Sequence, residues 1–253
     1  YNDYTNDAIG YIKSQDKGFF RIDKDFGSGP AIHGSINDAQ VQKYFGTPSY
    51  YSFNQINYIK FLQAMEYIIG ENETETRWAP GLKGAPFLHP FAGVKYALTK
   101  NKNTVFRDFN YDSLATAGDV MILKNRNTLP FGYTYDKIIT LNDFKKLSSN
   151  QRAITLYKAF VLDDSLYHNI TGFEKFQLKD SAMNYTWTEN GNDITALKKD
   201  SLIMESFSQD QIRGRIRTDK QKLLFFSIPF DKGWKAKIDN KEVNPVMVNV
   251  GFT

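Results

Sequence analysis

The chain has 253 residues, of which 41% are apolar and 24% are charged, proportions that are ordinary for one large folded domain or two small ones. Its 32 lysines and arginines and 28 aspartates and glutamates are spread along the chain, which excludes the concentrated basic face typical of a nucleic-acid-binding protein. The absence of cysteine excludes disulfides and thiolate metal sites, and no run of about 18 apolar residues is available to cross a membrane.

The first two thirds of the chain predict helices mixed with strands. A helix is expected from Thr5, because Ala8, Ile9 and Ile12 share one face. The strongest further helices are expected over residues 54–70 and 149–162. Strands are expected at 19–22, 94–99, 120–123 and 132–139, with loops at 26–36 and 71–90.

The last third predicts strands alone. They are expected at residues 173–178, 185–188, 201–207, 212–217, 223–228, 234–238 and 246–250. Asp239 and Asn240 lie between two of these runs and indicate a turn. The fold class is therefore expected to be α+β, with a mixed α/β unit over residues 1–168 followed by an all-β, sandwich-like unit over residues 169–253.

Five short motifs resemble the YfhO family of bacterial membrane proteins. They read FGTP at 45–48, YSFN at 51–54, GVKY at 93–96, LPFGY at 129–133 and FSIPFDKGWKAKID at 226–239. They span most of the chain in the order of the family, and the last is the most specific.

The resemblance implies a parent protein with many transmembrane helices, which transfers sugars from lipid-linked donors to cell-envelope polymers such as lipoteichoic acid. It implies that the catalytic carboxylate lies in a loop between early transmembrane helices, outside this chain. It also implies further strand and a membrane segment after Phe252, so the β unit is expected to be truncated at its C-terminus. Because the chain opens at Tyr1 without an initiator Met, it is interpreted as a piece of a longer protein.

The expected function is that of an accessory domain on the extracytoplasmic face of a bacterial membrane, periplasmic or extracellular. It would contact the transmembrane helices of its own protein, position an envelope glycan or anionic polymer acceptor, and lack a cofactor and catalytic residues of its own. A carbohydrate-binding or adhesion module without a transferase role is the alternative. A soluble hydrolase is a third possibility, which turnover of a glycan by the chain alone would favour.

The loop at 71–90 carries the first candidate ligand contacts, Arg77, Trp78 and His89. An aromatic ring for stacking beside charged hydrogen-bond donors is a combination with which proteins hold sugars and phosphates. The alternative is that Trp78 anchors the loop to its domain.

Three arginines at alternate positions, Arg213, Arg215 and Arg217, form the second candidate. On a strand they share one face, while Ile212, Gly214 and Ile216 are expected to face inward. The row is interpreted either as a solvated face or as a contact for lipid headgroups or a phosphate-bearing polymer, because arginine binds phosphate in a bidentate manner.

Asp231, Gly233 and Trp234 are interpreted as a structural turn that leads into a strand with Trp234 in the core. A sugar platform and a membrane-surface contact are the alternatives for Trp234. The three histidines, His33, His89 and His168, lie in separate segments without a zinc signature, so no metal site is expected.

Overall fold

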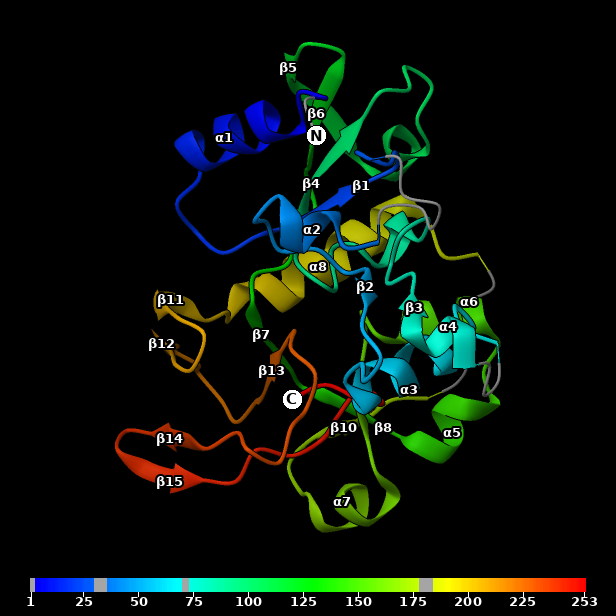
Figure 1. Ribbon diagram of the computed structural model, residues 1–253. Coiled ribbons are helices and arrows are strands. Elements are labelled where there is room, and N and C mark those ends of the chain that lie inside the picture. Colours follow the sequence, from blue (N-terminus) through cyan, green and yellow to red (C-terminus); the bar gives the residue numbers. More distant parts are fainter. Residues whose placement is uncertain (1–2, 30–35, 70–72, 178–183) are drawn as a thin grey trace. The chain divides into compact units, whose positions relative to one another are not determined.

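The computed structural model describes residues 3–29, 36–69, 73–177 and 184–253 (Figure 1). The chain divides into two compact units, each assembled from separate stretches. Unit 1 comprises Tyr1–Asn54, Glu71–Phe131 and Met204–Gly214, and unit 2 comprises Gln55–Gly70, Gly132–Ile203 and Arg215–Thr253. Both units contain helices and strands, which confirms the mixed α+β class.

Unit 1 is built around a four-stranded sheet. Its helical segments are α1 (Thr5–Gln15), α2 (Asp38–Val41), α4 (Glu73–Arg77), η1 (Pro86–Leu88) and η2 (Val105–Phe109). Its strands are β1 (Arg21–Lys24), β2 (Ser49–Tyr50), β3 (Trp78–Ala79), β4 (Val94–Thr99), β5 (Tyr111–Ala117) and β6 (Val120–Asn125), and most of the ribbon formed by β11 (Ile203–Phe207) and β12 (Ile212–Arg215) belongs here. The sheet order is β1-β4-β6-β5, with β1 and β4 parallel and the other pairs antiparallel.

Both faces of this sheet are covered. Helix α1 lies along it (Figure 1), and Ile9 and Ile12 pack into one core with Tyr96 and Leu98. Ala97 points to the opposite core, which it shares with η2 and β5. Strand β4 is therefore buried on both faces: Val94, Tyr96 and Leu98 make one face apolar, and Ala97 lies between Lys95 and Thr99 on the other.

Unit 2 contains several smaller sheets. Its helices are α3 (Ile56–Ala64), α5 (Leu141–Lys146), α6 (Ser149–Thr155), α7 (Asp164–Asn169) and α8 (Trp187–Lys199). Its strands are β7 (Gly132–Tyr135), β8 (Lys137–Thr140), β9 (Phe160–Leu162), β10 (Glu174–Lys175), β13 (Leu223–Phe226), β14 (Ala236–Ile238) and β15 (Lys241–Val243). They form a parallel sheet β10-β8-β9 and the antiparallel pairs β7–β13 and β14–β15.

Aromatic rings fill the core of unit 2. Tyr133 of β7 lies 5.0 Å from Phe225 of β13, and Tyr135 lies 5.3 Å from Phe160 of β9, between ring centroids. Phe61 of α3 meets Phe252 edge-on at 4.7 Å. Because aromatic rings bury much area, these contacts join β7, β9, β13 and α3 in one core.

Two of the expected helices are shorter in the structure. The helix expected over 54–70 ends at Ala64, because Glu66 adopts a left-handed φ of 63° that stops helical continuation. The helix expected over 149–162 ends at Thr155, and residues 160–162 form β9 instead. That short apolar strand is buried throughout, and periodicity cannot distinguish such a run from a buried helical turn.

The expectation of strands alone after residue 173 is wrong, because residues 187–199 form helix α8. Thr186 caps this helix: its side chain accepts a hydrogen bond from the Glu189 amide, and the Glu189 carboxylate accepts one from the Thr186 amide. The strand expected at 185–188 rested on β-prone Tyr, Thr and Trp. This reciprocal cap determines the helix start instead.

The boundary expected between residues 168 and 169 falls inside unit 2. Strand β7 lies before it and its partner β13 lies after it. That residues 1–168 and 169–253 fold independently of each other stays a prediction.

Candidate functional sites

An aromatic pair lies at the surface of unit 1. Strands β2 and β3 are antiparallel and place Tyr50 opposite Trp78, so the two rings stack with centroids 4.0 Å apart and an interplanar angle of 31°. Tyr50 is 38% exposed and Trp78 is half-buried. Tyr51 and Phe53, which follow Tyr50 in the chain, are 62% and 84% exposed.

Two asparagines hold the backbone segments that carry this aromatic pair. The Asn37 side chain accepts a hydrogen bond from the Tyr50 amide at 2.9 Å and donates one to the Tyr50 carbonyl at 3.1 Å. The Asn54 amide donates to the carbonyls of Thr76 and Arg77 at 2.8 and 3.1 Å. The short strands β2 and β3 are therefore held in place by these side-chain hydrogen bonds as well as by the backbone hydrogen bonds between them.

Arg77 lies next to Trp78 in the chain, at the end of α4, and its exposed guanidinium pairs with Glu73 one turn earlier. His89 lies elsewhere: it is fully buried, and its ring nitrogens contact the Tyr111 hydroxyl at 2.7 Å and the Leu82 carbonyl at 3.1 Å. Of the three candidates in the expected loop, the structure therefore brings Arg77 and Trp78 to the surface and places His89 in the core.

The three arginines of the second candidate are all exposed. Arg213 and Arg215 lie on β12, and Arg217 follows it. Gly214, which was expected to face inward, is also exposed, because this two-stranded ribbon has no covered face at that position. Arg213 belongs to unit 1 and the other two to unit 2.

The turn at residues 231–234 forms as expected. The Asp231 carboxylate accepts a hydrogen bond from the Gly233 amide at 2.8 Å, and the Trp234 amide donates to the Asp231 carbonyl at 3.1 Å. The interpretation of Trp234 as a core residue is wrong, because it is only half-buried and precedes β14. The hairpin that follows is largely exposed and offers little core for Trp234 to enter.

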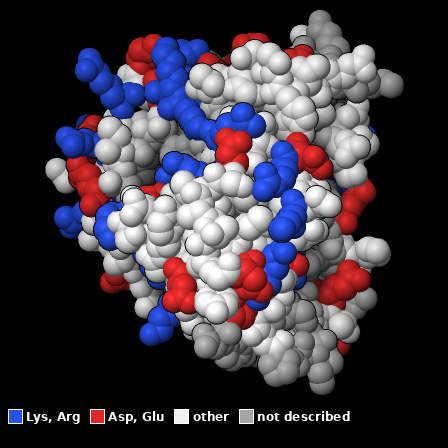
Figure 2. All heavy atoms as spheres, turned by 90° about the horizontal axis from the view of Figure 1, so that it is seen from above, with Lys and Arg blue, Asp and Glu red and all other residues white. Residues whose placement is uncertain are grey.

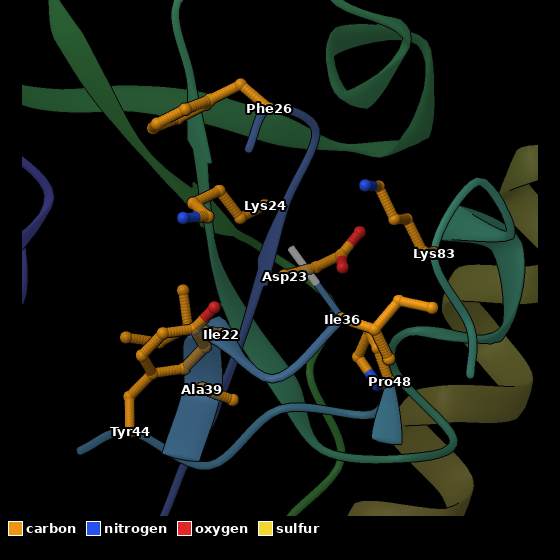
Figure 3. Close-up of a pocket in the computed structure, with 9 residues that line it drawn as sticks. All are labelled: Ile22, Asp23, Lys24, Phe26, Ile36, Ala39, Tyr44, Pro48 and Lys83. Atoms are coloured by element: carbon orange, nitrogen blue, oxygen red, sulfur yellow. The ribbon is translucent and has the colours of Figure 1, made fainter. Parts of the chain in front are cut away.

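A charged cluster that the sequence pattern did not predict lies inside unit 1. Strand β1 continues through Asp23 and Lys24, which project to opposite sides of the strand and are 2% and 5% exposed (Figure 3). Lys24 pairs with the buried Asp38 and donates to the Gln42 side chain at 3.2 Å. A small hollow lies beside this cluster, lined by Ile22, Asp23, Lys24, Phe26, Ile36, Ala39, Tyr44, Pro48 and Lys83.

Burial dominates the electrostatics of this cluster. It raises the pKa of Asp23 above its usual range, although the nearby His89 and Lys83 act in the opposite direction. Burial lowers the pKa of His89, so its imidazole is neutral at physiological pH. The pKa of Lys24 is lowered by burial, against the attraction of Asp38.

The cluster was not expected because β1 is longer than the sequence pattern indicates. The strand expected at 19–22 ends in Ile22, and the charged residues after it look like the start of a loop. In the structure the strand runs two residues further beside β4, so alternation carries Asp23 and Lys24 into the interior.

In the parts of the chain that the structure describes, no group of three or more His, Asp or Glu side chains is placed to hold a metal ion. His33 lies outside these residues. None of the described helices is long and apolar enough to cross a bilayer.

Comparison with known proteins gives a family match. The family model described as bacterial membrane protein YfhO matches residues 1–196 and 191–253, which together cover the chain. No curated protein and no solved structure matches it.

Proposed function

The chain belongs to the family of the bacterial membrane protein YfhO, and on this premise we propose that it is an accessory, extracytoplasmic part of a polytopic glycosyltransferase-like protein. In this role it contacts the transmembrane helices of its own protein and positions a cell-envelope glycan or polymer acceptor. The parent protein supplies the catalytic residues.

The observation that carries the proposal is the stacked pair of Tyr50 and Trp78 at the surface of unit 1. Rigid aromatic side chains provide a large contact area at low entropic cost, and their flat faces suit the apolar faces of sugar rings. The guanidinium of Arg77, next in the chain to Trp78, adds a charged donor for hydroxyl or phosphate oxygens.

A domain without catalytic residues can still accelerate sugar transfer by orienting the acceptor. Holding a hydroxyl nucleophile near a membrane-embedded site replaces a bimolecular encounter by a positioned one, which can remove several kcal/mol of a barrier. The hydrogen bonds of Asn37 and Asn54 keep the aromatic surface preorganised for this purpose.

The test is a titration of the chain with purified envelope glycans, using Trp78→Ala. Trp187→Ala is the matched control, because Trp187 is a 47% exposed tryptophan in unit 2. We expect Trp78→Ala to weaken binding at least about tenfold, equivalent to ~1.4 kcal/mol, and the control to bind normally. Equal binding by wild type and Trp78→Ala would overturn the proposed site.

A second measurement distinguishes a site that positions the acceptor for transfer from one that only binds glycans. In the full-length protein in detergent, Trp78→Ala should reduce transfer to the acceptor and leave the KM for the lipid-linked donor unchanged. Lost glycan binding with undiminished transfer would instead support a carbohydrate-binding or adhesion module without a transferase role.

A further inference from the structure

A cleft with a volume of about 720 Å³ lies in unit 2. Its walls come from helix α8, from strands β7 and β8, and from residues 219–222 just before β13. All of the described residues that line it belong to unit 2, so the cleft is formed within one compact unit. Pockets that bind small molecules have volumes of roughly 300–1,000 Å³, so the cleft has room for one small organic ligand.

Buried apolar residues form part of the lining of the cleft. Tyr135, Tyr157 and Phe176 are buried, and the Tyr135 hydroxyl donates a hydrogen bond to the Leu156 carbonyl at 2.6 Å. Leu197 reaches the cleft from α8 and is also buried. Because these side chains are held by packing, this apolar wall exists before a ligand arrives.

The wall of the cleft carries more positive than negative charge. Among the described residues that line it are three aspartates and five lysines, which are Lys137, Lys158, Lys199, Lys220 and Lys222. Lys137 and Lys222 are paired with Glu174 and Asp200, which are not among these lining residues. The cleft therefore presents an excess of two ammonium groups to a ligand.

This excess is large for the chain. Over the face shown in Figure 2, basic and acidic side chains are intermingled, so that their charges largely offset each other. The net charge of all 253 residues is only +4. Two positive charges in the wall of one cleft are therefore a local feature that favours an anionic ligand.

Two of the lysines lie close to one carboxylate. Strand β13 begins at Leu223, which pairs with Tyr135 of β7. Lys220 and Lys222 precede this pair and Asp136 follows it, and Lys220 Nζ lies 2.9 Å from Asp136 Oδ2. Burial raises the pKa of Asp136, but the hydrogen bond of Lys220 and the charges of both lysines hold it below its usual range. A negative charge is therefore favoured beside these two ammonium groups.

The ion pairs of the cleft can be exchanged for contacts with a ligand. The side chains of Lys220 and Asp136 are 60% and 44% exposed, and those of Lys199 and Asp219 are 69% and 67% exposed. Such exposed ion pairs contribute little to stability, because water and salt screen them. A phosphate group competes well with these carboxylates, since it carries more charge and one more acceptor oxygen.

The excess of two positive charges distinguishes between anions. A phosphate monoester carries about 1.5 to 2 negative charges near neutral pH, whereas a carboxylate carries one and a neutral sugar carries none. Lys158 and Asp193, with 2.9 Å between Nζ and Oδ2, also line the cleft and offer a donor and an acceptor for hydroxyl groups. A sugar or polyol that bears a phosphate combines both kinds of group.

We propose that this cleft binds a phosphate monoester of a sugar or polyol, with the phosphate at Lys220 and Lys222 and the hydroxyl groups at Lys158 and Asp193. The site shares no residue with the Tyr50–Trp78 surface, so it does not depend on the function proposed above.

The test is an NMR titration of the chain with glucose 6-phosphate and glycerol 3-phosphate, which distinguishes a sugar from a polyol. Glucose and inorganic phosphate are the matched probes, because each lacks one half of the proposed ligand. We expect saturable shifts of unit 2 amides for at least one ester at roughly 0.1–10 mM, and weaker binding of both matched probes. Binding of neither ester, or binding of glucose or inorganic phosphate as tight as that of the esters, would overturn the proposal.

Two variants with opposite expected effects assign the phosphate position. Lys220→Met should weaken binding of the ester at least about tenfold, and Asp136→Asn should tighten it at least about threefold, because it removes the carboxylate that competes for Lys220. Lys146→Met is the matched control and should bind normally. Lys146 also belongs to unit 2, is 68% exposed and pairs with Asp143 at 2.8 Å, but it does not line the cleft.

Loss of folding cannot imitate this pattern, because a destabilised variant does not bind more tightly. The side chains of Lys220 and Asp136 are both substantially exposed, so their replacement leaves the core unchanged. Equal affinity of wild type, Lys220→Met and Asp136→Asn for the ester would overturn the proposed phosphate position.

Discussion

Lys24 and Asp38 form a buried ion pair, with side chains 4% and 7% exposed. A buried pair contributes little compared with apolar residues of the same shape, but removal of one partner leaves an uncompensated charge. The pair therefore constrains the local structure: it joins β1 to α2 and requires both residues to be retained or replaced together.

Asp38→Ala is expected to lower the free energy of unfolding by about 3 kcal/mol, because the buried Lys24 would lose its ion-pair partner and keep the neutral Gln42 as a hydrogen-bond acceptor. The double variant Lys24→Met/Asp38→Ala should recover part of this loss. Urea denaturation of the four proteins in the cycle measures the effect, and additive losses in the double variant would show that the two side chains are not coupled.

Asp23 and His89 predict opposite pH dependences of stability. The folded-state pKa of His89 is lowered from its ordinary 6.5, so its contribution is present above pH 6.5 and is lost as the pH falls below that value. The folded-state pKa of Asp23 is raised from 3.8, so stability falls as the pH rises from 3.8 through the folded-state pKa. The two contributions partly cancel in acid.

Asp23→Asn should therefore steepen the loss of stability below pH 6.5, since only the His89 contribution remains. Urea midpoints for wild type and Asp23→Asn, measured from pH 7 down to about 4, give the two slopes. Parallel curves would show that Asp23 does not titrate differently in the folded and unfolded states.

At the scale of elements, helix α8 is fixed by its first turn. It contains Gly191 and several polar residues, and of its side chains only Asn190, Ile194 and Leu197 are buried. Its helix propensity and burial are therefore modest, and the reciprocal cap between Thr186 and Glu189 accounts for where it begins.

Thr186→Ala is expected to lower the free energy of unfolding by about 1 kcal/mol, and Thr186→Ser should be close to neutral, because both Thr and Ser accept the capping hydrogen bond. Amide hydrogen exchange should show the loss of protection in the first turn of α8. Wild-type protection in Thr186→Ala would mean that the cap does not determine the helix start.

The hairpin β14–β15 is another element with a local cause. Asp239 and Asn240, at its turn, have left-handed φ angles of 50° and 64°, as the sequence predicted for a turn between two strands.

Trp234, just before this hairpin, is half-buried. Trp234→Ala should therefore lower the free energy of unfolding by about 1–2 kcal/mol, less than the roughly 3–5 kcal/mol of a core tryptophan. Thermal or urea denaturation distinguishes the two values.

At the scale of the whole chain, the proposed accessory role predicts that the chain alone does not transfer sugar. The purified chain should show no transfer from lipid-linked donors to envelope polymers, whereas the full-length protein in detergent should. Transfer by the chain alone would contradict the accessory role, and hydrolysis of a glycan would indicate a hydrolase.

Fragments of the chain test whether the boundary near residue 168 separates two folding units. A fragment of residues 1–168 contains β7 but not β13, whose Leu223–Phe226 pairs with it and whose Phe225 packs on Tyr133 and Tyr135. If that pairing is required, the part of unit 2 in this fragment should not unfold cooperatively. A cooperative transition for both fragments would establish the boundary as one between independent folding units.

Several local elements, and the family, follow from contiguous patterns in the sequence. Helix α1, strand β4 and the turn at Asp239 and Asn240 follow from periodicity and turn chemistry, which act over a few neighbouring residues. The family motifs are contiguous in the same way, and the family match covers the chain.

Which polar residues are buried, and which distant segments meet, depends on contacts between remote parts of the chain. Asp23 and His89 are separated by 66 positions, and His89 Nε2 lies 3.4 Å from Asp23 Oδ2, because β1 pairs with β4 and His89 lies just before β4 in the chain. Trp78 faces Tyr50 only through the β2–β3 register. Such contacts depend on strand pairing between remote segments, and local sequence patterns carry no direct record of that pairing.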